Sequence, residues 1–200
     1  MSGQVYFGSF LVTRQVALPH SICKQSYTFT CPCLTFKKVF HLTPLSFALV
    51  NLKPLLPGHV LVSPRRVVPR FSDLSHAEVV DLFVTVQRVA RMIERVYTAS
   101  SLNIAVQDGA DAGQSVPHLH THIIPRKKAD MDTKGGGDAI YSMLEGEEGD
   151  IGKELQSRRT QRSDFHGVNN ENRQPRSEEV MAQEAEKLAL EMDADQIQSS

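Results

Sequence analysis

Three of the eight histidines in this chain lie at alternate positions, His118, His120 and His122, in the stretch PHLHTHIIPR. Successive side chains of an extended strand point to opposite faces of a sheet, so the three imidazoles are expected on one face. Such a group could bind a metal ion such as zinc, or it could perform nucleophilic chemistry on a phosphate. It could also be no more than a polar sheet face.

The loop before the histidines favours phosphate chemistry. Gly113, Gln114 and Ser115 are small or carry polar groups, and a loop of this composition can surround a phosphate with backbone N–H donors. A catalytic zinc site usually needs a further histidine or a carboxylate, and its ligands need partners of their own. We therefore expect a phosphate site, with no metal bound by the protein's own side chains.

The sequence patterns that surround the histidines predict an α+β domain, with an antiparallel sheet of about five strands and two main helices that position the site. Strand-like composition is found in residues 5–12, in two runs within 45–65, and in residues 102–108 and 118–125. The turn residues of LKPLLPGH indicate that the two runs form a hairpin. A glycine-containing loop separates the last two strands, so we expect them to be antiparallel neighbours.

Two segments have the pattern of helices. Residues 75–97 begin with a capping box, Ser75 followed three residues later by Glu78. Their apolar stripe at helical spacing consists of Val79, Leu82, Phe83, Val86, Ala90, Ile93 and Val96. Residues 177–192 begin with Ser177 as N-cap, and one face of this helix carries Met181, Ala185, Leu188 and Met192.

The chain of 200 residues is long enough for one domain with an additional loop. We expect a core over residues 1–126, a polar flexible loop over 127–176 with AIYSML as a short helical candidate, and a C-terminal helix with a short tail over 177–200.

Composition argues against several classes of partner. The formal net charge of −1 gives no global attraction to nucleic acid or to anionic membranes. No apolar run approaches the roughly 20 residues of a membrane span, and no secretory signal is visible. The odd number of cysteines, clustered at Cys23, Cys31 and Cys33, does not suit a disulfide framework. A cytoplasmic or nuclear protein is expected.

The histidine stretch resembles the motif of the histidine triad family, His-φ-His-φ-His-φ-φ, where φ is apolar. The similarity is greatest to the fragile histidine triad branch, the dinucleoside triphosphate hydrolases, and it extends in order over LSFALVNLKPLLPGHVLVSPR, the capped helix, LNIAVQDGADAGQSVPHLHTHIIPRK and RSEEVMAQEAEKLAL. Gln107 before Asp-Gly, and Pro125 with Arg126, distinguish the chain from the nucleoside phosphoramidase branch. The resemblance implies the HIT-like fold.

The resemblance also implies a role for each histidine. His120 would be the nucleophile that attacks the α-phosphorus and forms a covalent adenylyl-imidazole. A neutral imidazole suits this step because it attacks without extra charge and its phosphoramidate is labile near neutral pH. His118 would hold the tautomer of His120 through a hydrogen bond, and His122 would contact the α-phosphate or the bridging oxygen of the leaving nucleotide.

Other residues are implied to bind the substrate. Asn51 would hydrogen-bond a ribose, and apolar residues such as Leu49 would sandwich adenine. His59 is expected to be structural rather than catalytic. Gln107 would contact phosphate oxygens together with the loop residues Gly113, Gln114, Ser115 and Val116.

The expected activity is the cleavage of diadenosine triphosphate to AMP and ADP. The alternatives are a nucleoside phosphoramidase or adenylylsulfate hydrolase, a nucleotide-binding signalling module with weak turnover, and a metal-binding protein. Any Mg²⁺ or Mn²⁺ would be held by the substrate's phosphates, because the matched positions offer no carboxylate cage, and no tightly bound cofactor is expected. The resemblance further implies a homodimer whose sheets join edge to edge.

The chain departs from its relatives at three places. Residues 17–38 form an additional segment that is either a hairpin insertion or a translated, unspliced intron. Thr121 occupies a position that is usually apolar, and its hydroxyl needs a partner if it is buried. Phe10 stands where relatives often have a histidine near the base pocket.

Overall fold

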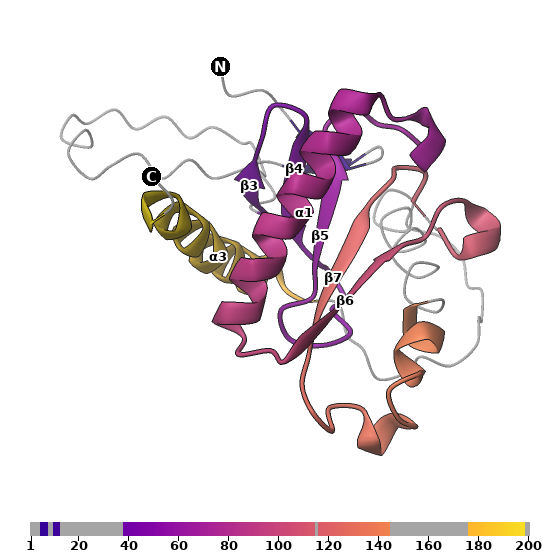
Figure 1. Ribbon diagram of the computed structural model, residues 1–200, viewed down its shortest axis with the longest axis vertical. Helices are drawn as coiled ribbons and strands as arrows, with labels where there is room; N and C mark the ends of the chain where they lie inside the picture. The colour runs from indigo at the N-terminus through magenta and orange to yellow at the C-terminus, as the bar shows by residue number, and fades with distance from the viewer. Residues whose placement is uncertain (1–4, 8–9, 13–37, 115, 145–175, 199–200) are drawn as a thin grey trace.

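The computed structural model describes residues 5–7, 10–12, 38–114, 116–144 and 176–198 (Figure 1). Residues 17–37 of the additional segment lie outside this description. The first described residues form a small hairpin, in which β1 (Val5–Phe7) pairs antiparallel with β2 (Phe10–Val12). The expected single strand over 5–12 is thus two short strands.

The main sheet has five strands in the order β3-β4-β5-β7-β6, and every neighbouring pair is antiparallel. Their bounds are β3 Val39–Leu42, β4 Ser46–Val50, β5 Val60–Pro64, β6 Ser101–Val106 and β7 Thr121–Arg126. The predicted α+β class, the β4–β5 hairpin and the antiparallel β6–β7 pair are confirmed. The edge strand β3 was not foreseen.

The strand register aligns one histidine with a row of apolar residues. His122 of β7 lies opposite Leu61 of β5, Leu61 lies opposite Leu49 of β4, and Leu49 lies opposite Val39 of β3. Directly opposed residues share one face of a sheet. We call this face, which carries His122, the site face.

The opposite face is covered by helix α1 (His76–Val96), which begins as predicted. The Ser75 hydroxyl accepts a hydrogen bond from the Glu78 N–H, and the Glu78 carboxylate accepts one from the Ser75 N–H. Leu82, Val86, Ala90 and Ile93 are buried, but Phe83 of the predicted stripe is exposed, with its ring edge-on to Phe71. Val89 and Met92, which the predicted stripe did not include, are buried, because the buried face of the helix is rotated slightly from the predicted stripe.

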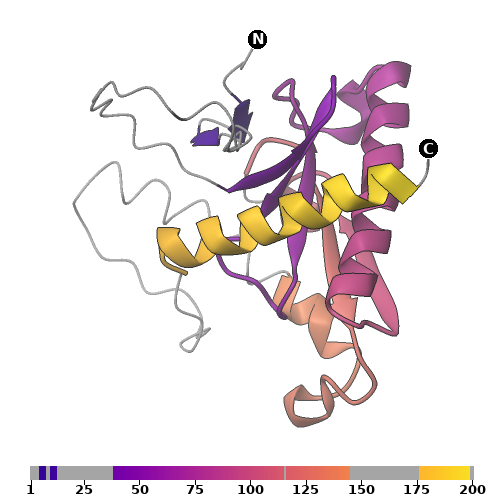
Figure 2. The same ribbon diagram turned by 90° about the vertical axis from the view of Figure 1, so that its left-hand side faces the viewer.

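Helix α3 (Glu178–Gln198) packs beside α1 and along the β3 and β4 side of the sheet (Figure 2). Its buried face consists of Met181, Ala185, Leu188 and Met192, as predicted. These residues join the side chains of α1 and of the helix-covered sheet face in the largest apolar cluster of the described chain. This cluster packs against the sheet on the side opposite to the site face.

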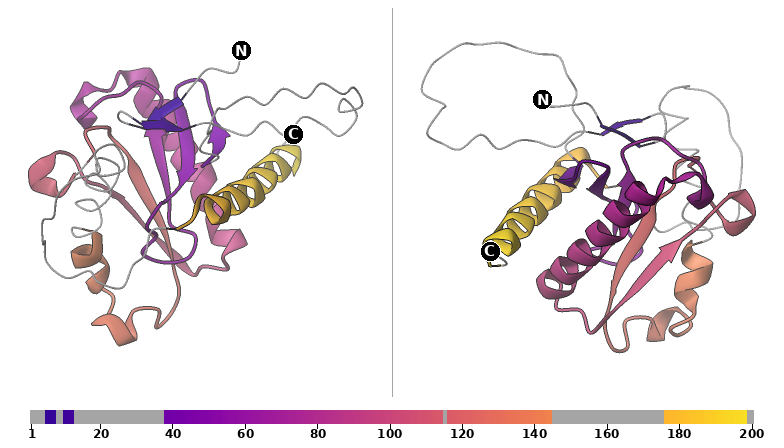
Figure 3. Two further views of the ribbon diagram at one scale, coloured as in Figure 1. Left: turned by 180° about the vertical axis from the view of Figure 1, so that it is seen from behind. Right: turned by 45° about the horizontal axis from the view of Figure 1, so that its top comes forward.

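Residues 127–144 differ from the expected flexible loop. Residues 139–144 are helical, as predicted for AIYSML, and Met131, Ile140 and Leu144 are buried against Ile124 of β7 and Leu55. Seen from behind, this segment and the β1–β2 hairpin lie on the side of the sheet away from α1 (Figure 3, left). The composition of this segment is polar, but its few apolar residues pack together and cover part of the site face. Residues 145–175 lie outside the description.

Thr121 is fully buried, and its Oγ1 makes no hydrogen bond within the described part of the chain. A buried hydroxyl without a partner costs about 1–3 kcal/mol, whereas an apolar group of the same shape has no such cost. We therefore expect Thr121→Val to raise the free energy of unfolding by about 1 kcal/mol in a urea titration.

Thr85 of α1 provides a matched control, because it is equally buried but its Oγ1 donates to the Asp81 carbonyl at 2.7 Å. Thr85→Val should raise the free energy of unfolding by less than Thr121→Val does, or should lower it. Equal effects of the two substitutions would show that the Thr121 hydroxyl carries no special cost.

Candidate active site

The histidine stretch enters the sheet later than expected. His118, Leu119 and His120 precede β7, which begins at Thr121. The segment is still fixed, because the Leu119 N–H donates to the Val68 carbonyl at 2.7 Å and the Leu119 side chain is buried in the core beneath α1. The rings of His120 and His122 lie 5.0 Å apart between centroids, so the structure brings these two imidazoles together.

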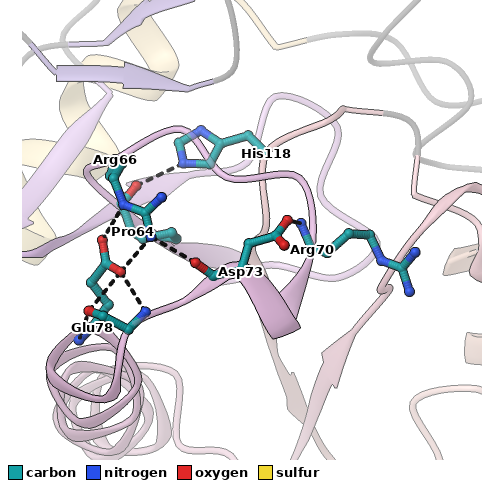
Figure 4. A network of polar contacts seen from close by, with 7 residues as sticks. Pro64, Arg66, Arg70, Asp73, Glu78 and His118 are labelled. Atoms are coloured by element: carbon teal, nitrogen blue, oxygen red, sulfur yellow. Dashed lines mark hydrogen bonds and ion pairs between the residues drawn. The ribbon is translucent and has the colours of Figure 1, made fainter.

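His118 is anchored at the end of β5 (Figure 4). Its Nε2 lies 2.8 Å from the Pro64 carbonyl and 3.1 Å from the Ser63 hydroxyl. A carbonyl only accepts, so Nε2 carries the proton. The next turn of chain is fastened to α1, because the Arg66 guanidinium pairs with both carboxylate oxygens of Glu78 at 2.8 and 2.7 Å. The capping box and the histidine anchor therefore belong to one polar network.

The tautomer of His120 follows from the group that lies next to its Nδ1 atom. Nδ1 of His120 lies 2.8 Å from the backbone carbonyl of His118 and must donate to it. In a neutral ring the other nitrogen, Nε2, then holds the lone pair. In this tautomer Nε2 of His120 is the atom that could act as a nucleophile, and the orienting group is the backbone carbonyl of His118.

His59 fixes the opposite tautomer in His122. The Leu55 N–H donates to Nδ1 of His59 at 3.2 Å, which places the proton of the neutral His59 ring on Nε2. That Nε2 lies 2.9 Å from Nδ1 of His122. Nδ1 of His122 accepts this hydrogen bond, so the proton of His122 lies on Nε2. The two neighbouring imidazoles therefore present a lone pair at His120 and an N–H at His122.

The loop between β4 and β5, residues 51–59, carries two of these polar residues, and we call it the site loop. Asn51 is buried at its start, and its Oδ1 accepts the Lys53 N–H at 3.1 Å. Its Nδ2 lies 3.4 Å from Nε2 of His59. His59 was expected to be structural, and its buried ring contacts His122 directly. The Gly-His sequence alone did not signal this contact.

Gln107 follows the last residue of β6 and is 9% exposed. Its side-chain Oε1 is buried and has no hydrogen-bond partner in the described residues. Buried polar atoms are almost always paired, so an unpaired one suggests a ligand or a water that completes it. The next residue, Asp108, is held by Arg70 and by the Phe71 N–H at 2.8 Å.

The glycine-containing loop is shaped by two positive φ angles, 102° at Gly109 and 91° at Gly113. The Gln114 side chain closes the loop, because its Oε1 accepts the Gly109 N–H at 3.0 Å and its Nε2 donates to the Pro69 carbonyl at 3.0 Å. Gln114 therefore shapes the loop with its amide. Ser115 lies outside the described residues, and Val116 is buried.

An apolar cluster lies beside the histidines on the site face, formed by Phe7, Val39, Phe47, Leu49, Leu61 and Val116. The ring of Phe7 meets His120 edge-on at 5.1 Å and His118 at 5.4 Å. Phe7 was missed by sequence reasoning, since one aromatic residue in a short strand has no distinguishing pattern. Phe10 lies in β2, and its side chain is outside the description.

Two further properties concern metals and membranes. The described residues contain no group of three or more histidine, cysteine, aspartate or glutamate side chains that could hold a metal ion. Within the same residues, no helix has both the length and the apolar character that a membrane span requires.

Burial is the largest influence on His118, and it lowers the pKa of this ring to about 4, against the opposing effect of the Pro64 carbonyl. The unfolded chain, with a pKa of about 6.5, binds the proton more readily, so stability is lost as the pH falls from about 6.5 towards 4. We expect the linkage at His118 to remove about 2 kcal/mol of stability between pH 7 and pH 5.

The measurement is the free energy of unfolding at both pH values for the native chain and for His118→Gln, which cannot titrate. The variant should lose about 2 kcal/mol less than the native chain over this interval. An NMR titration of the His118 ring gives an independent reading, and an apparent pKa near 6.5 in the folded protein would contradict the expectation.

The model of the HIT domain matches residues 35–129. The asymmetrical bis(5'-nucleosyl)-tetraphosphatase of Schizosaccharomyces pombe is 57% identical over 114 residues, 57% of this chain and 61% of that protein. The bifunctional bis(5'-adenosyl)-triphosphatase/adenylylsulfatase FHIT of Arabidopsis thaliana is 45% identical over 151 residues, 72% of this chain and 82% of that protein. The chain thus spans less than two thirds of the first of these relatives and most of the second.

Solved structures agree with the fold. The crystal structure of the Caenorhabditis elegans NitFhit protein superposes with a TM-score of 0.60 at 33% identity, over 96% of this chain and 31% of that one. The diadenosine triphosphate hydrolase of Plasmodium falciparum superposes with a TM-score of 0.52 at 27% identity, over 78% of this chain and 87% of that one.

Proposed function

The chain belongs to the HIT domain family, in its fragile histidine triad branch, and we propose that it hydrolyses dinucleoside polyphosphates, cleaving diadenosine triphosphate into AMP and ADP. The observation that carries this proposal is the pair of opposed tautomers at His120 and His122. A nucleophilic nitrogen and a hydrogen-bond donor for the leaving oxygen, in adjacent rings, are the two groups that transfer of a phosphoryl group to an imidazole requires.

In the first step, Nε2 of His120 attacks the α-phosphorus and forms a P–N bond, while the bond from that phosphorus to the bridging oxygen breaks. Nε2–H of His122 donates a hydrogen bond to this oxygen and stabilises the negative charge that develops there, so ADP leaves as its anion and the neutral His122 ring keeps its proton. The adduct carries a positive charge on the His120 ring, which the His118 carbonyl stabilises through Nδ1–H.

In the second step, water attacks the same phosphorus. The electron pair of the broken P–N bond returns to Nε2 of His120, one proton of the water stays on AMP and the other passes to solvent. AMP leaves, and the His120 ring returns to its neutral starting tautomer. His59 supports His122 throughout, since its Nε2–H fixes the tautomer in which Nε2 of His122 is the hydrogen-bond donor.

The remaining residues are assigned to substrate binding. Gln107 has a buried amide oxygen with no partner in the described residues, which suits an amide that reorients towards phosphate oxygens and water. The loop residues Gly113, Gln114, Ser115 and Val116 would offer backbone N–H groups to the same phosphates. Asn51 would bind a ribose, and Leu49, in the apolar cluster of the site face, would contact adenine.

We assign the divalent cation, Mg²⁺ or Mn²⁺, to the substrate's phosphates rather than to a protein cage. The support is the donor set, because the candidate active site is built of imidazoles, amides and backbone groups, whereas such hard cations prefer carboxylate and phosphate oxygens. When present, the cation would neutralise phosphate charge.

The first test is the trapping of labelled AMP on the protein during turnover, followed by mapping of the adduct. The label should be on His120. His120→Asn should lower turnover by roughly 10⁴-fold while dinucleotide binding persists, because only the nucleophile is removed. Normal turnover by this variant would refute the proposal.

The same assay separates the two rings. With diadenosine triphosphate, His122→Ala should lower turnover by about 10²–10³-fold, because the charge that develops on the leaving oxygen loses its hydrogen-bond donor. With the p-nitrophenyl ester of AMP, whose leaving group spreads its charge over an aromatic ring, turnover should fall less than about tenfold. His120→Asn is the matched control, since it should lose activity on both substrates.

The chain length of the polyphosphate and the leaving group are open to direct comparison. The Arabidopsis relative is named for adenylylsulfatase as well as triphosphatase activity, and the S. pombe relative for tetraphosphatase activity. The proposed chemistry requires only an adenylyl group and a leaving group, which is an oxygen in the polyphosphates and adenylylsulfate and a nitrogen in a phosphoramidate. Rates on diadenosine triphosphate, diadenosine tetraphosphate, adenylylsulfate and an adenosine phosphoramidate would rank these substrates, and we place the triphosphate first.

We also propose a homodimer in which two sheets join along β6. β6 is an edge strand of the described sheet, and Ile104 and Val106 are exposed on it. Such an edge invites pairing with a second copy. Ile104→Lys should convert the dimer to a monomer in sedimentation at micromolar concentration. Val180→Lys on α3 is the control, with 48% exposure against 50% for Ile104, and it should leave the mass unchanged.

A cytoplasmic location, with the nucleus as a second compartment, is likewise a proposal. Its support is the set of three clustered cysteines, an odd number that does not suit the disulfide framework of a secreted protein.

A further inference from the structure

Both ends of the site loop are held by a polar array that includes residues of α3. Arg176, two residues before this helix, donates its backbone N–H to the Leu52 carbonyl at 3.2 Å, and its Nη2 donates to the Asn51 carbonyl. Its Nη1 pairs with Oε2 of Glu184 at 2.5 Å. Both side chains are largely buried, at 18% and 14% exposure. One guanidinium therefore connects the helix to the start of the loop.

The other end of the loop is held by Tyr97, which follows α1. Its hydroxyl donates to Oε1 of Glu184 at 2.7 Å. Its ring lies against Gly58, so closely that a Cβ added there would come within 2.6 Å of a ring carbon. Gly58 has a φ of 85° and directly precedes His59. The two carboxylate oxygens of Glu184 thus connect Arg176 at the start of the loop with Tyr97 at its end.

We propose that Arg176, held by Glu184 together with Tyr97, is a positioning residue for the site loop. This inference rests on the proposed function, because the loop carries Asn51, assigned to the ribose, and His59, which sets the tautomer of His122. Arg176, Glu184 and Tyr97 do not touch the proposed reacting atoms. They hold the backbone from which two site residues project.

The arrangement suits positioning more than general stability. A partly buried Arg–Glu pair contributes little net stability compared with apolar side chains of the same volume, but it fixes geometry because each donor has a set direction. The Asn51 carbonyl accepts a hydrogen bond from the guanidinium, and the Asn51 side chain is oriented by the hydrogen bond that its Oδ1 accepts from the Lys53 N–H. Displacement of such a backbone by about 1 Å can lower a rate roughly 100-fold.

The test compares Arg176→Met with Arg95→Met. Arg95 also links α1 to α3, through Glu191 at 2.5 Å and Asp195 at 2.7 Å, and within the described residues its ion pairs are with α3 rather than with the site loop. We expect Arg176→Met to raise the KM for diadenosine triphosphate about tenfold, while Arg95→Met changes it by less than twofold. Arg176→Lys should raise the KM less than Arg176→Met does. A single ammonium can reach Glu184 or the Asn51 carbonyl, whereas the forked guanidinium reaches both.

A double-mutant cycle shows whether Arg176 acts through Asn51. If it does, Arg176→Met should add little to the KM effect of Asn51→Ala, whereas Arg95→Met should combine with Asn51→Ala additively. Additive effects of Arg176→Met and Asn51→Ala, or an unchanged KM in Arg176→Met, would overturn the inference.

Amide hydrogen exchange gives a reading that is independent of activity. The Lys53, Leu55 and His59 N–H groups are hydrogen-bonded within the site loop, and their exchange should accelerate at least tenfold in Arg176→Met but not in Arg95→Met. Unchanged exchange refutes the positioning role, whereas a native protein that cleaves no dinucleotide refutes the proposed function instead. If Arg176→Met does not fold, Glu184→Gln should show the same exchange change with a smaller amplitude, and no change there would equally refute the role.

Discussion

The hydrogen bond from Nδ1 of His120 to the His118 carbonyl is the interaction on which the candidate active site depends. An imidazole has one proton and two nitrogens, so fixing the proton on one nitrogen decides which atom can attack. A backbone carbonyl is well suited to this task, because it cannot donate and its position is set by the fold. The same carbonyl stabilises the ring when it becomes positively charged in the proposed adduct.

The sheet and its helices serve to keep that carbonyl and its neighbours in place. The His118 ring is bonded to the end of β5, and the chain just beyond is fastened by Arg66 to the first turn of α1. The strand register sets His122 in line with Leu61 and Leu49 on the site face. Burying four imidazoles is costly unless they are paired, and the apolar cluster on the opposite face offsets this cost.

Local patterns in the sequence were sufficient for most of the fold. The capping box at Ser75, the turn at Gly58 and the apolar face of α3 each depend on residues within a few positions of one another, and the structure has all three elements. The exception is residues 127–144, whose composition is polar. Their burial depends on the contact of Met131 and Ile140 with Ile124, and no periodic pattern in the local sequence predicts this contact.

The parts of the candidate active site that could not be predicted are those in which distant residues meet. His59 and His122 are 63 positions apart, and Arg176 and Asn51 are 125 apart, so neither spacing marks the pairs as neighbours. The resemblance supplied one orienting group, the hydrogen bond between His118 and His120, but not the contacts of His59 and Arg176. In this chain His59 and His118 lie in loops within the matched domain, whereas Arg176 and Glu184 lie beyond it, so the proposed positioning of the histidine rings also depends on α3.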